Sequence, residues 1–385
     1  MSVAEAAELA TIAQDPALRR SYAAARRLNA EHGRTYYLAT LFLPAWKRPY
    51  VHALYGFARY TDDIVDSLDA QLTGAERAAW LADWGSRLLD TLHRGADAAG
   101  DRPAPTIATL PRVTVPGAPL ADAAVPGAPV PGTSVLGNPG PSVPGPSVLG
   151  TSVPDARRPA VGANPAKRGP DAGDVSVLPA VLHTIRRWDL PIGHFEAFLA
   201  SMAMDLTVTG YDTFDALMTY VYGSGTVIGL QMLPLLEPSS PAAAAYAGDL
   251  GTAFQLINFL RDVGEDLRRG RVYLPRESMD LFGVTRERLA TGVVDGAVRR
   301  LLGHEVGRAR ELLRAATPGI RLLHPTSRDC VWTAARLYGG ILDEIEKADY
   351  QVLSRRVAVG TPRRLAVAGR ALVRSNLHRL VPPQR

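Results

Sequence analysis

Residues 255–275 read QLINFLRDVGEDLRRGRVYLP and combine an apolar helical pattern with a line of polar side chains. Gln255, Asn258, Asp262 and Asp266 follow one another at offsets of 0, 3, 7 and 11 residues, which places them on one face of a helix. Two aspartates four residues apart repel each other by a few tenths of a kcal/mol, so the helix gains nothing locally from this arrangement. We therefore expect a cation to lie beside this face.

A second stretch, residues 53–66, repeats the pattern about 200 residues earlier as ALYGFARYTDDIVD. Here Tyr55, Arg59, Asp62 and Asp66 stand at offsets of 0, 4, 7 and 11. A single acidic pair of this kind is equally compatible with a solvated helix face balanced by arginines, but two matched stripes disfavour that alternative. Polar stripes on apolar helices indicate that the two helices face each other across a solvated or ligand-filled cavity.

The cation best suited to such a cavity is Mg²⁺, with Mn²⁺ as a substitute. Mg²⁺ takes one or two protein carboxylates and completes its coordination with water and phosphate oxygens. Arginines crowd the second cluster, at positions 261, 268, 269 and 271. Guanidinium groups bind phosphate oxygens through paired hydrogen bonds, so the pattern predicts a metal cluster that holds a diphosphate.

Residues 255–275 closely resemble the second aspartate-rich motif of the squalene and phytoene synthase family, the head-to-head isoprenyl diphosphate synthases, and residues 53–66 resemble its first motif. A DDxxD string alone also occurs in head-to-tail prenyltransferases and terpene cyclases. Asn258, the LRDVGED core and the trailing Tyr273-Leu274-Pro275 narrow the choice. Within the family, the chain is most similar to bacterial phytoene synthases.

The resemblance extends over most of the chain. Residues 32–40 (HGRTYYLAT) are similar to an early substrate loop, with Gly33 and Thr35 at positions where serine is frequent. Residues 202–211 resemble the central helix of the family, and residues 341–359 resemble its last helices. Residues 219–229 resemble a helix rich in tyrosine and glycine, although Ser224-Gly225-Thr226 replaces the usual Val-Ala-Gly.

The resemblance implies three sets of site residues. The catalytic set is Asp62, Asp66, Asp262, Asp266, Tyr220 and Arg59. The substrate-binding set is Arg34, Thr35, Tyr36, Tyr55, Gln255, Asn258, Arg261, Arg271 and Tyr273. The metal ligands are Asp62, Asp66, Asn258, Asp262 and Asp266. For Arg59 and Arg261 a structural salt bridge to the neighbouring aspartates is an equal alternative, and for Tyr220 so is a buried ring with a satisfied hydroxyl.

The implied reaction belongs to carotenoid biosynthesis. Two geranylgeranyl diphosphates condense head to head through prephytoene diphosphate to phytoene, with release of diphosphate and without NADPH. The alternative is a squalene or presqualene diphosphate synthase that acts on farnesyl diphosphate. A non-catalytic prenyl-lipid binding protein would lack the metal ligands that are present here, and a terpene cyclase would carry an Asn/Ser/Glu triad in place of DVGED.

Composition agrees with a single all-α domain of the isoprenoid-synthase type with a central cavity. The 385 residues are 46% hydrophobic, and apolar positions recur at the helical period. The net charge of +5 is carried by arginines without an aromatic-studded basic stripe, which argues against a nucleic-acid partner. No secretory signal is visible, and Cys330 is the single cysteine, so we expect a cytoplasmic protein with Cys330 as a small core residue.

Residues 96–175 differ from the rest of the chain. They hold roughly half of the 30 prolines, in near-repeats such as VPGAP at Val115 and Val125. Too few large apolar groups are present to offset the chain entropy, so we expect a disordered Pro/Gly-rich insertion between a helix that ends near Leu92 and one that begins near Leu178. Residues 1–95 and 176–385 would form the catalytic domain. A neutral expansion is favoured over a docking linker.

Residues 361–385 alternate arginines with leucines. Two interpretations stay open. The favoured one is a terminal helix that packs on the body with a solvated arginine face. The other is a basic amphipathic helix on the anionic inner face of a membrane, where the apolar product and other carotenoid enzymes would gather.

Overall fold

The computed structural model describes residues 9–10, 12–66, 72–97, 176–364, 366–367 and 369. These residues belong to one compact unit, formed by Met1–Arg112 and Pro170–Arg385. Within them every regular element is helical, apart from two isolated bridges, which confirms the predicted all-α class. The elements are α2 (Pro16–His32), α3 (Arg34–Thr40), α4 (Arg48–Asp66), α5 (Gly74–Asp97), α6 (Leu178–Trp188), α7 (Ile192–Met204), α8 (Phe214–Val221), the π-helical turn η3 (Tyr222–Thr226), α9 (Val227–Met232), η4 (Pro234–Leu236), α10 (Ala243–Arg268), α11 (Arg276–Leu281), α12 (Arg286–Ala290), α13 (Gly296–Ala316), η5 (Thr317–Leu322) and α14 (Pro325–Lys347).

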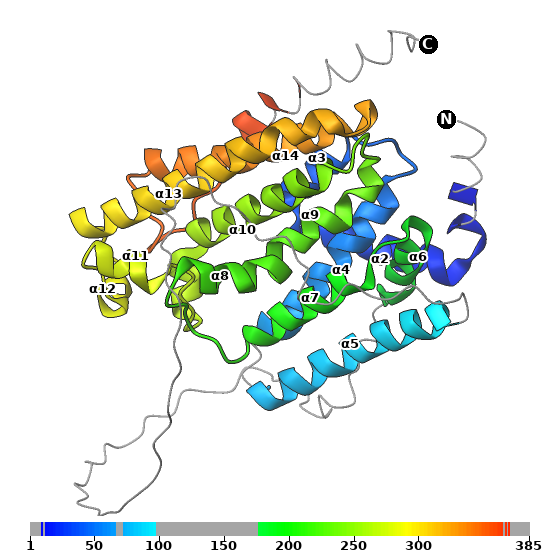
Figure 1. Cartoon of the computed structure of the whole chain (residues 1–385), viewed down its shortest axis with the longest axis horizontal. Coiled ribbons are helices and arrows are strands. Elements are labelled where there is room, and N and C mark those ends of the chain that lie inside the picture. The colour runs from blue at the N-terminus through cyan, green and yellow to red at the C-terminus, as the bar shows by residue number, and fades with distance from the viewer. Residues whose placement is uncertain are drawn as a thin grey trace, which may run out of the picture. The chain divides into compact units, whose positions relative to one another are not determined.

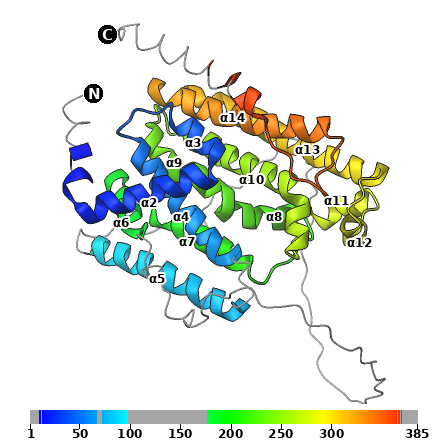
Figure 2. The same cartoon turned by 180° about the vertical axis from the view of Figure 1, so that it is seen from behind.

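Helix α10 is the central support of the site. It packs against α9 and η3 on one side and against α13 and α14 on another, as Figures 1 and 2 show. Helix α4 packs on α2, α5 and α6. The two helices that carry the aspartate-rich motifs are therefore each held by several neighbours, which fixes the direction of their polar faces.

Local signals set the helix boundaries. Helix α2 begins at Pro16 after Asp15, whose carboxylate accepts the backbone N–H groups of Ala17 at 2.8 Å and Leu18 at 3.1 Å. Helix α5 ends at Asp97 and α6 begins at Leu178, close to the limits predicted from the sequence. The remainder of the predicted insertion, residues 98–175, lies outside the described residues, and so does most of residues 361–385.

Four glycines let η3 and α9 touch α7 and α10 backbone to backbone; we call this contact the glycine crossing (Gly223, Gly225, Gly229 and Gly251). A Cβ atom on Gly229 would lie 2.0 Å from the carbonyl oxygen of Ala247 in α10, and one on Gly251 would lie 2.3 Å from the carbonyl oxygen of Gly225. Real Cβ contacts never approach so closely. Each glycine destabilises its helix by roughly 1 kcal/mol relative to alanine. The close approach of the backbones explains why glycine nevertheless occupies these positions.

Two stretches depart from the helices expected from the sequence. Residues 202–211 are helical only to Met204, and Asp205 begins a turn. Residues 341–359 are helical only to Lys347, so the prediction of helix beyond that point is wrong. The physical reason is local, because Asp349 and Tyr350 have φ of 51° and 60°, which an α-helix does not accommodate. Residues 349–360, which we call the strap, then run without helix.

Two further predictions concern the core and the membrane. Cys330 is buried in α14, and burial raises the pKa of its thiol to about 12, as expected of a small core residue. In the part of the chain that the structure describes, none of the helices combines the length and apolarity needed to cross a bilayer.

Candidate active site

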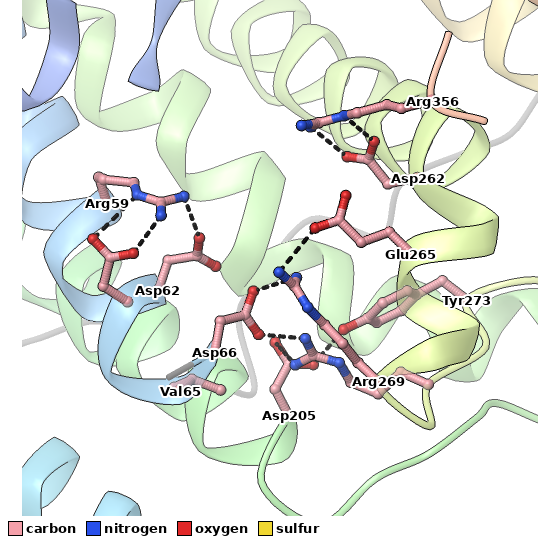
Figure 3. A network of polar contacts seen from close by, with 12 residues as sticks. Arg59, Asp62, Val65, Asp66, Asp205, Asp262, Glu265, Arg269, Tyr273 and Arg356 are labelled. Atoms are coloured by element: carbon pink, nitrogen blue, oxygen red, sulfur yellow. Dashed lines mark hydrogen bonds and ion pairs between the residues drawn. The ribbon is translucent and has the colours of Figure 1, made fainter. Parts of the chain in front are cut away.

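Asp62 and Asp66 of α4 lie on the side of that helix that faces Asp262 of α10 (Figure 3). Asp62 and Asp66 lie on the last turns of α4, and Asp262 and Asp266 lie near the end of α10. Among the described residues no three acidic, histidine or cysteine side chains converge closely enough to hold one ion by themselves. The four aspartates are therefore separated from one another, and two arginines pair with each of Asp66 and Asp262.

Asp66 is held by two arginines from the end of α10 and the turn after it. Arg269 Nη1 donates to Asp66 Oδ2 at 2.7 Å, and Arg271 Nη2 donates to Asp66 Oδ1. Figure 3 shows the Arg269 side chain reaching across to α4. The two motifs are thus joined by ion pairs before any ligand is considered.

Asp262 accepts hydrogen bonds from two guanidinium groups. Arg261 donates from Nε to Oδ1 at 2.9 Å and from Nη2 to Oδ2 at 2.5 Å. Arg356, from the strap, donates to the same two oxygens at 2.7 and 3.0 Å. Burial alone would raise the pKa of Asp262, but these hydrogen bonds and charges lower it below its usual value.

The other two aspartates are much less satisfied. Asp266 is only 9% exposed, yet within the described residues its side chain has no hydrogen bond or ion pair. Burial and the nearby charge of Asp262 raise its pKa to about 7. Burial and Asp66 likewise raise the pKa of Asp62 to about 7, although 43% of that side chain remains accessible. A carboxylate that is accessible and still desolvated by its surroundings is placed to accept a cation.

Arg59 pairs with the acidic residues of its own helix. Its Nη1 lies 3.3 Å from Asp62 Oδ2, and its Nε lies 3.2 Å from Asp63 Oδ2. The structural salt bridge considered as an alternative for Arg59 is therefore formed, mainly with Asp63. The long contact to Asp62 leaves that carboxylate open to other partners.

Beside the aspartates lies a second polar centre around Asp205, a residue that the sequence did not single out. Tyr220 Oη donates to Asp205 Oδ2 at 2.6 Å, and Tyr273 Oη donates to Oδ1 at 2.7 Å. Arg271 Nη1 lies 3.6 Å from the same carboxylate and so links Asp205 to Asp66. Burial of the Asp205 side chain, which is 5% exposed, raises the pKa of its carboxyl group in spite of these partners.

Aromatic rings line the contact between α3, α4, α10 and α14. Tyr36 lies 6.2 Å from Tyr55, 5.4 Å from Tyr338 and 6.3 Å from Phe254, measured between ring centroids. Gly33 explains part of this geometry, because a Cβ atom there would lie 2.7 Å from the Tyr55 ring. A serine at position 33 would therefore require the Tyr55 ring to move.

Asn258 and Gln255 join the polar face of α10 to these rings. Asn258 Nδ2 lies 3.4 Å from Gln255 Oε1, while Asn258 Oδ1 is buried without a partner within the described residues. A buried amide oxygen without a donor suits a cation or a ligand group. Gln255 also packs on the glycine crossing, since a Cβ atom on Gly225 would lie 2.7 Å from Gln255 Cβ.

Two residues predicted to contact substrate, Arg34 and Thr35, make no hydrogen bond or ion pair with the described residues around the aspartates, Asp205 and the aromatic rings. Arg34 is exposed at the start of α3 and Thr35 is half-buried. Both therefore stay predictions.

Four side chains at the site were missed by sequence reasoning, and one of them, Phe254, lies just before the stretch 255–275 and reads as an ordinary apolar residue of the helix. Asp205 lies in the stretch 202–211 and Arg356 in the stretch 341–359, and both stretches were noted for their resemblance without these residues being singled out. Tyr338 lies just before the second of these stretches, and an isolated tyrosine on an apolar helix gives no signal of its own. In each case the partner is distant in sequence, so local spacing carries no information.

As a whole, the site combines unsatisfied carboxylates, several arginines and an aromatic wall. The carboxylates can bind a divalent cation, the arginines can bind an anion with phosphate oxygens, and the rings can cover an apolar chain.

Comparisons with known proteins agree with these properties. The sequence profile of the family described as Squalene/phytoene synthase matches residues 29–124 and 155–363 and passes over the stretch between them. The phytoene synthase of Arthrospira platensis is 29% identical over 370 residues, which cover 93% of this chain and 94% of that protein. The 15-cis-phytoene synthase of Synechocystis sp. is 30% identical over 357 residues, 90% of this chain and 82% of that protein.

Solved structures share the fold. A dehydrosqualene synthase crystallised with a ligand superposes with a TM-score of 0.63 at 21% identity and covers 93% of this chain and 97% of its own. Squalene synthase HpnC from Alicyclobacillus acidocaldarius gives a TM-score of 0.58 at 20% identity, with 86% of this chain and 94% of its own covered.

Proposed function

Because the chain belongs to the squalene/phytoene synthase family, whose members are head-to-head prenyltransferases, we propose that it is a phytoene synthase. It would condense two geranylgeranyl diphosphates through prephytoene diphosphate to phytoene and release diphosphate. Relatives named phytoene synthase that match over more than 90% of the chain support this choice of product.

The observation that carries the proposal is the uneven pairing of the four aspartates. In the described part of the chain, Asp62 pairs only with Arg59 at 3.3 Å and Asp266 has no side-chain partner, and both have raised pKa values, whereas Asp66 and Asp262 are paired with arginines. A site built only for stability would satisfy all four. A site with both open carboxylates and clustered guanidinium groups fits a ligand that carries cations and anions together, such as a metal diphosphate.

The residues fit Mg²⁺, for which Mn²⁺ would substitute. Asp62, Asp266 and the unpartnered Oδ1 of Asn258 are hard oxygen donors, with Asp66 and Asp262 available once their arginines turn away. When bound, the ion would neutralise the diphosphate and stabilise the charge that develops on the departing group.

The arginines would bind the same leaving group. Arg269 and Arg271 extend from the end of α10 to Asp66 and so lie between the two motifs. Guanidinium groups placed where negative charge develops stabilise a transition state without reorganising at the moment of reaction. Arg59 and Arg261 would add to this field from either side.

The centre around Asp205 would orient groups rather than remove a proton. Burial, with the charge of Asp205, raises the pKa of Tyr220 well above its usual range, so the phenol stays protonated at neutral pH. Its hydrogen bond to Asp205 fixes the ring, whose face can steady a carbocation. The released diphosphate is then the stronger candidate for proton acceptor.

The aromatic wall would exclude water from the reacting chains. The ring of Tyr36 lies against those of Tyr55, Phe254 and Tyr338, and Phe254 directly precedes Gln255 in α10. Water would trap either carbocation of a two-step head-to-head reaction, so the reaction requires such a cover.

The test is product identification. Purified protein is incubated with Mg²⁺ and either geranylgeranyl or farnesyl diphosphate, with and without NADPH, and the hydrocarbons are separated by chromatography. We expect phytoene from the C20 substrate without NADPH, and no product from the Asp266→Ala variant. Squalene or presqualene diphosphate from the C15 substrate would replace the proposal with the alternative, and absence of any hydrocarbon would reject both.

A further inference from the structure

The strap carries one side chain into the site. Its buried residues Val352, Leu353, Val357 and Val359 are at most 8% exposed and anchor it on either side of an exposed middle. Gly264 of α10 admits it, because a Cβ atom there would lie 2.1 Å from the carbonyl oxygen of Leu353. The strap is thus fixed at both ends, and Arg356 projects from its middle toward Asp262 (Figure 3).

Asp262 has no room for another partner while Arg356 is in place. Arg261 and Arg356 each donate two hydrogen bonds to its two oxygens, at distances between 2.5 and 3.0 Å. An ionised carboxylate offers about four acceptor positions. A cation can therefore reach Asp262 only if one guanidinium group leaves.

The two arginines are not equally free to leave. The Arg261 side chain is 20% exposed and lies on α10 directly beside Asp262. The Arg356 side chain is 56% exposed, stands on a segment without helix, and within the described residues has Asp262 as its only partner. An exposed ion pair is the weaker of the two, so Arg356 is the group that gives way.

We propose that Arg356 is a displaceable counter-cation that occupies Asp262 in the ligand-free enzyme and yields it to a divalent cation when diphosphate arrives. This inference rests on the proposed function, since it takes the aspartates as metal ligands. The guanidinium group that leaves Asp262 becomes available to the anionic ligand. Cation and diphosphate binding are therefore coupled through one side chain, and each strengthens the other by the same factor.

The experiment is a titration of the full-length, metal-free protein with Mn²⁺, with free Mn²⁺ followed by electron paramagnetic resonance. It is done without and with inorganic pyrophosphate, after correction for the Mn²⁺–pyrophosphate complex. The variant is Arg356→Gln. The matched control is Arg355→Gln, which removes the same charge one residue away from an exposed side chain without a hydrogen bond or ion pair in the described part of the chain.

We expect Arg356→Gln to bind Mn²⁺ about fivefold more tightly than the wild type without pyrophosphate, and to lose most of the coupling to pyrophosphate. Arg355→Gln should match the wild type. In an Asp262→Asn background, Arg356→Gln should have no effect, which ties the result to this carboxylate.

Three outcomes would overturn the inference. Unchanged or weaker Mn²⁺ binding by Arg356→Gln would make Arg356 a fixed salt bridge, and the proposed function would stand. An equal gain in Arg355→Gln would show a general effect of charge. No Mn²⁺ binding by any variant at any pyrophosphate concentration would remove the metal assignment of the proposed function as well.

Discussion

Helix α10 has two regions that are built in opposite ways. In its first half, Gly251 touches the backbone of Gly225, and Thr252 Oγ1 lies 2.7 Å from Thr226 Oγ1. In its second half, the buried Asp266 has no side-chain partner among the residues that the structure describes, and Asp262 is paired with two arginines. The first region is packed to backbone contact, whereas the second keeps polar groups that a ligand would satisfy.

The difference indicates how one helix supports both fold and chemistry. Close backbone contact at the glycine crossing holds α9 and α10 together, so the polar half does not need to stabilise the fold. Unsatisfied buried carboxylates destabilise a protein, and they persist where function uses them. Changes in the two halves should therefore have opposite consequences.

The largest expected effect is at the polar half. Asp266→Ala and Asp62→Ala should each lower kcat by about 1,000-fold or more, because a ligand of the metal diphosphate is lost. Stability at pH 7.5 should stay the same or rise, since a desolvated charge is removed. Turnover is measured by hydrocarbon chromatography and stability by urea unfolding.

Asp63→Ala is the matched control for Asp62. Asp63 is the adjacent carboxylate and pairs with Arg59. It should keep activity within about tenfold of the wild type, the effect of perturbing one positioned charge. Near-normal turnover of Asp266→Ala would remove the contrast between the two halves of α10.

The next effect is at the glycine crossing. Gly229→Ala should lower the free energy of unfolding by about 3 kcal/mol, because the new methyl group meets the Ala247 carbonyl oxygen at 2.0 Å. Gly307→Ala, in α13 with no atom within 4 Å of the added Cβ, should instead stabilise by up to about 1 kcal/mol. Urea unfolding compares the two, and equal values would contradict the role given to the crossing.

A smaller effect is the pH dependence of the metal-free protein. The pKa values of Asp62 and Asp266 are about 7 in the folded state, above the value of about 4 in an unfolded chain. The folded state therefore binds more protons between pH 4 and 7, and the free energy of unfolding should fall as pH rises through that window. Asp266→Asn should reduce the slope. Urea unfolding in EDTA at pH 5.5 and 8.0 measures it, and an unchanged slope in the variant would contradict the assignment.

Removal of one hydrogen bond to Asp205 should lower kcat less than the loss of Asp62 or Asp266 does. Tyr220→Phe and Tyr273→Phe each leave the carboxylate with the other tyrosine, so each should lower kcat by about tenfold, equivalent to about 1.4 kcal/mol. The double variant should lose more than the product of the two, because Asp205 would then keep only Arg271. Simple multiplication of the single effects would show that the tyrosines act independently.

The smallest effect is expected from the insertion. Deletion of residues 100–172 should leave kcat within about twofold and leave the unfolding midpoint unchanged, since loop closure depends only weakly on length. The family profile passes over residues 125–154, the central part of the deleted stretch, and matches the chain up to residue 124 and again from residue 155. Loss of folding in the shortened protein would mean that the insertion contributes to the core.

The sequence predicted the parts of this protein that depend on local spacing. The helical stripes of α4 and α10 follow from the periods of their residues, and the helix that begins near Leu178 follows from the change in composition before it. Asp205 could not be found in this way, because its tyrosine partners lie 15 and 68 residues away. Arg356 was hidden for the same reason, with 94 residues between it and Asp262. The end of α14 at Lys347 depends on Asp349 and Tyr350, which adopt positive φ angles. Neither is a glycine, so the sequence did not indicate this break in the helix.

The burial of Cys330 has a practical consequence for spectroscopy. The chain has no other cysteine, and a thiol with a pKa of about 12 forms almost no thiolate at neutral pH, so it reacts very slowly with maleimides. A cysteine introduced at the exposed Ser354 would therefore be labelled selectively without prior removal of the native one. A fluorophore or nitroxide there would report directly on the surroundings of the strap while cation and diphosphate are added.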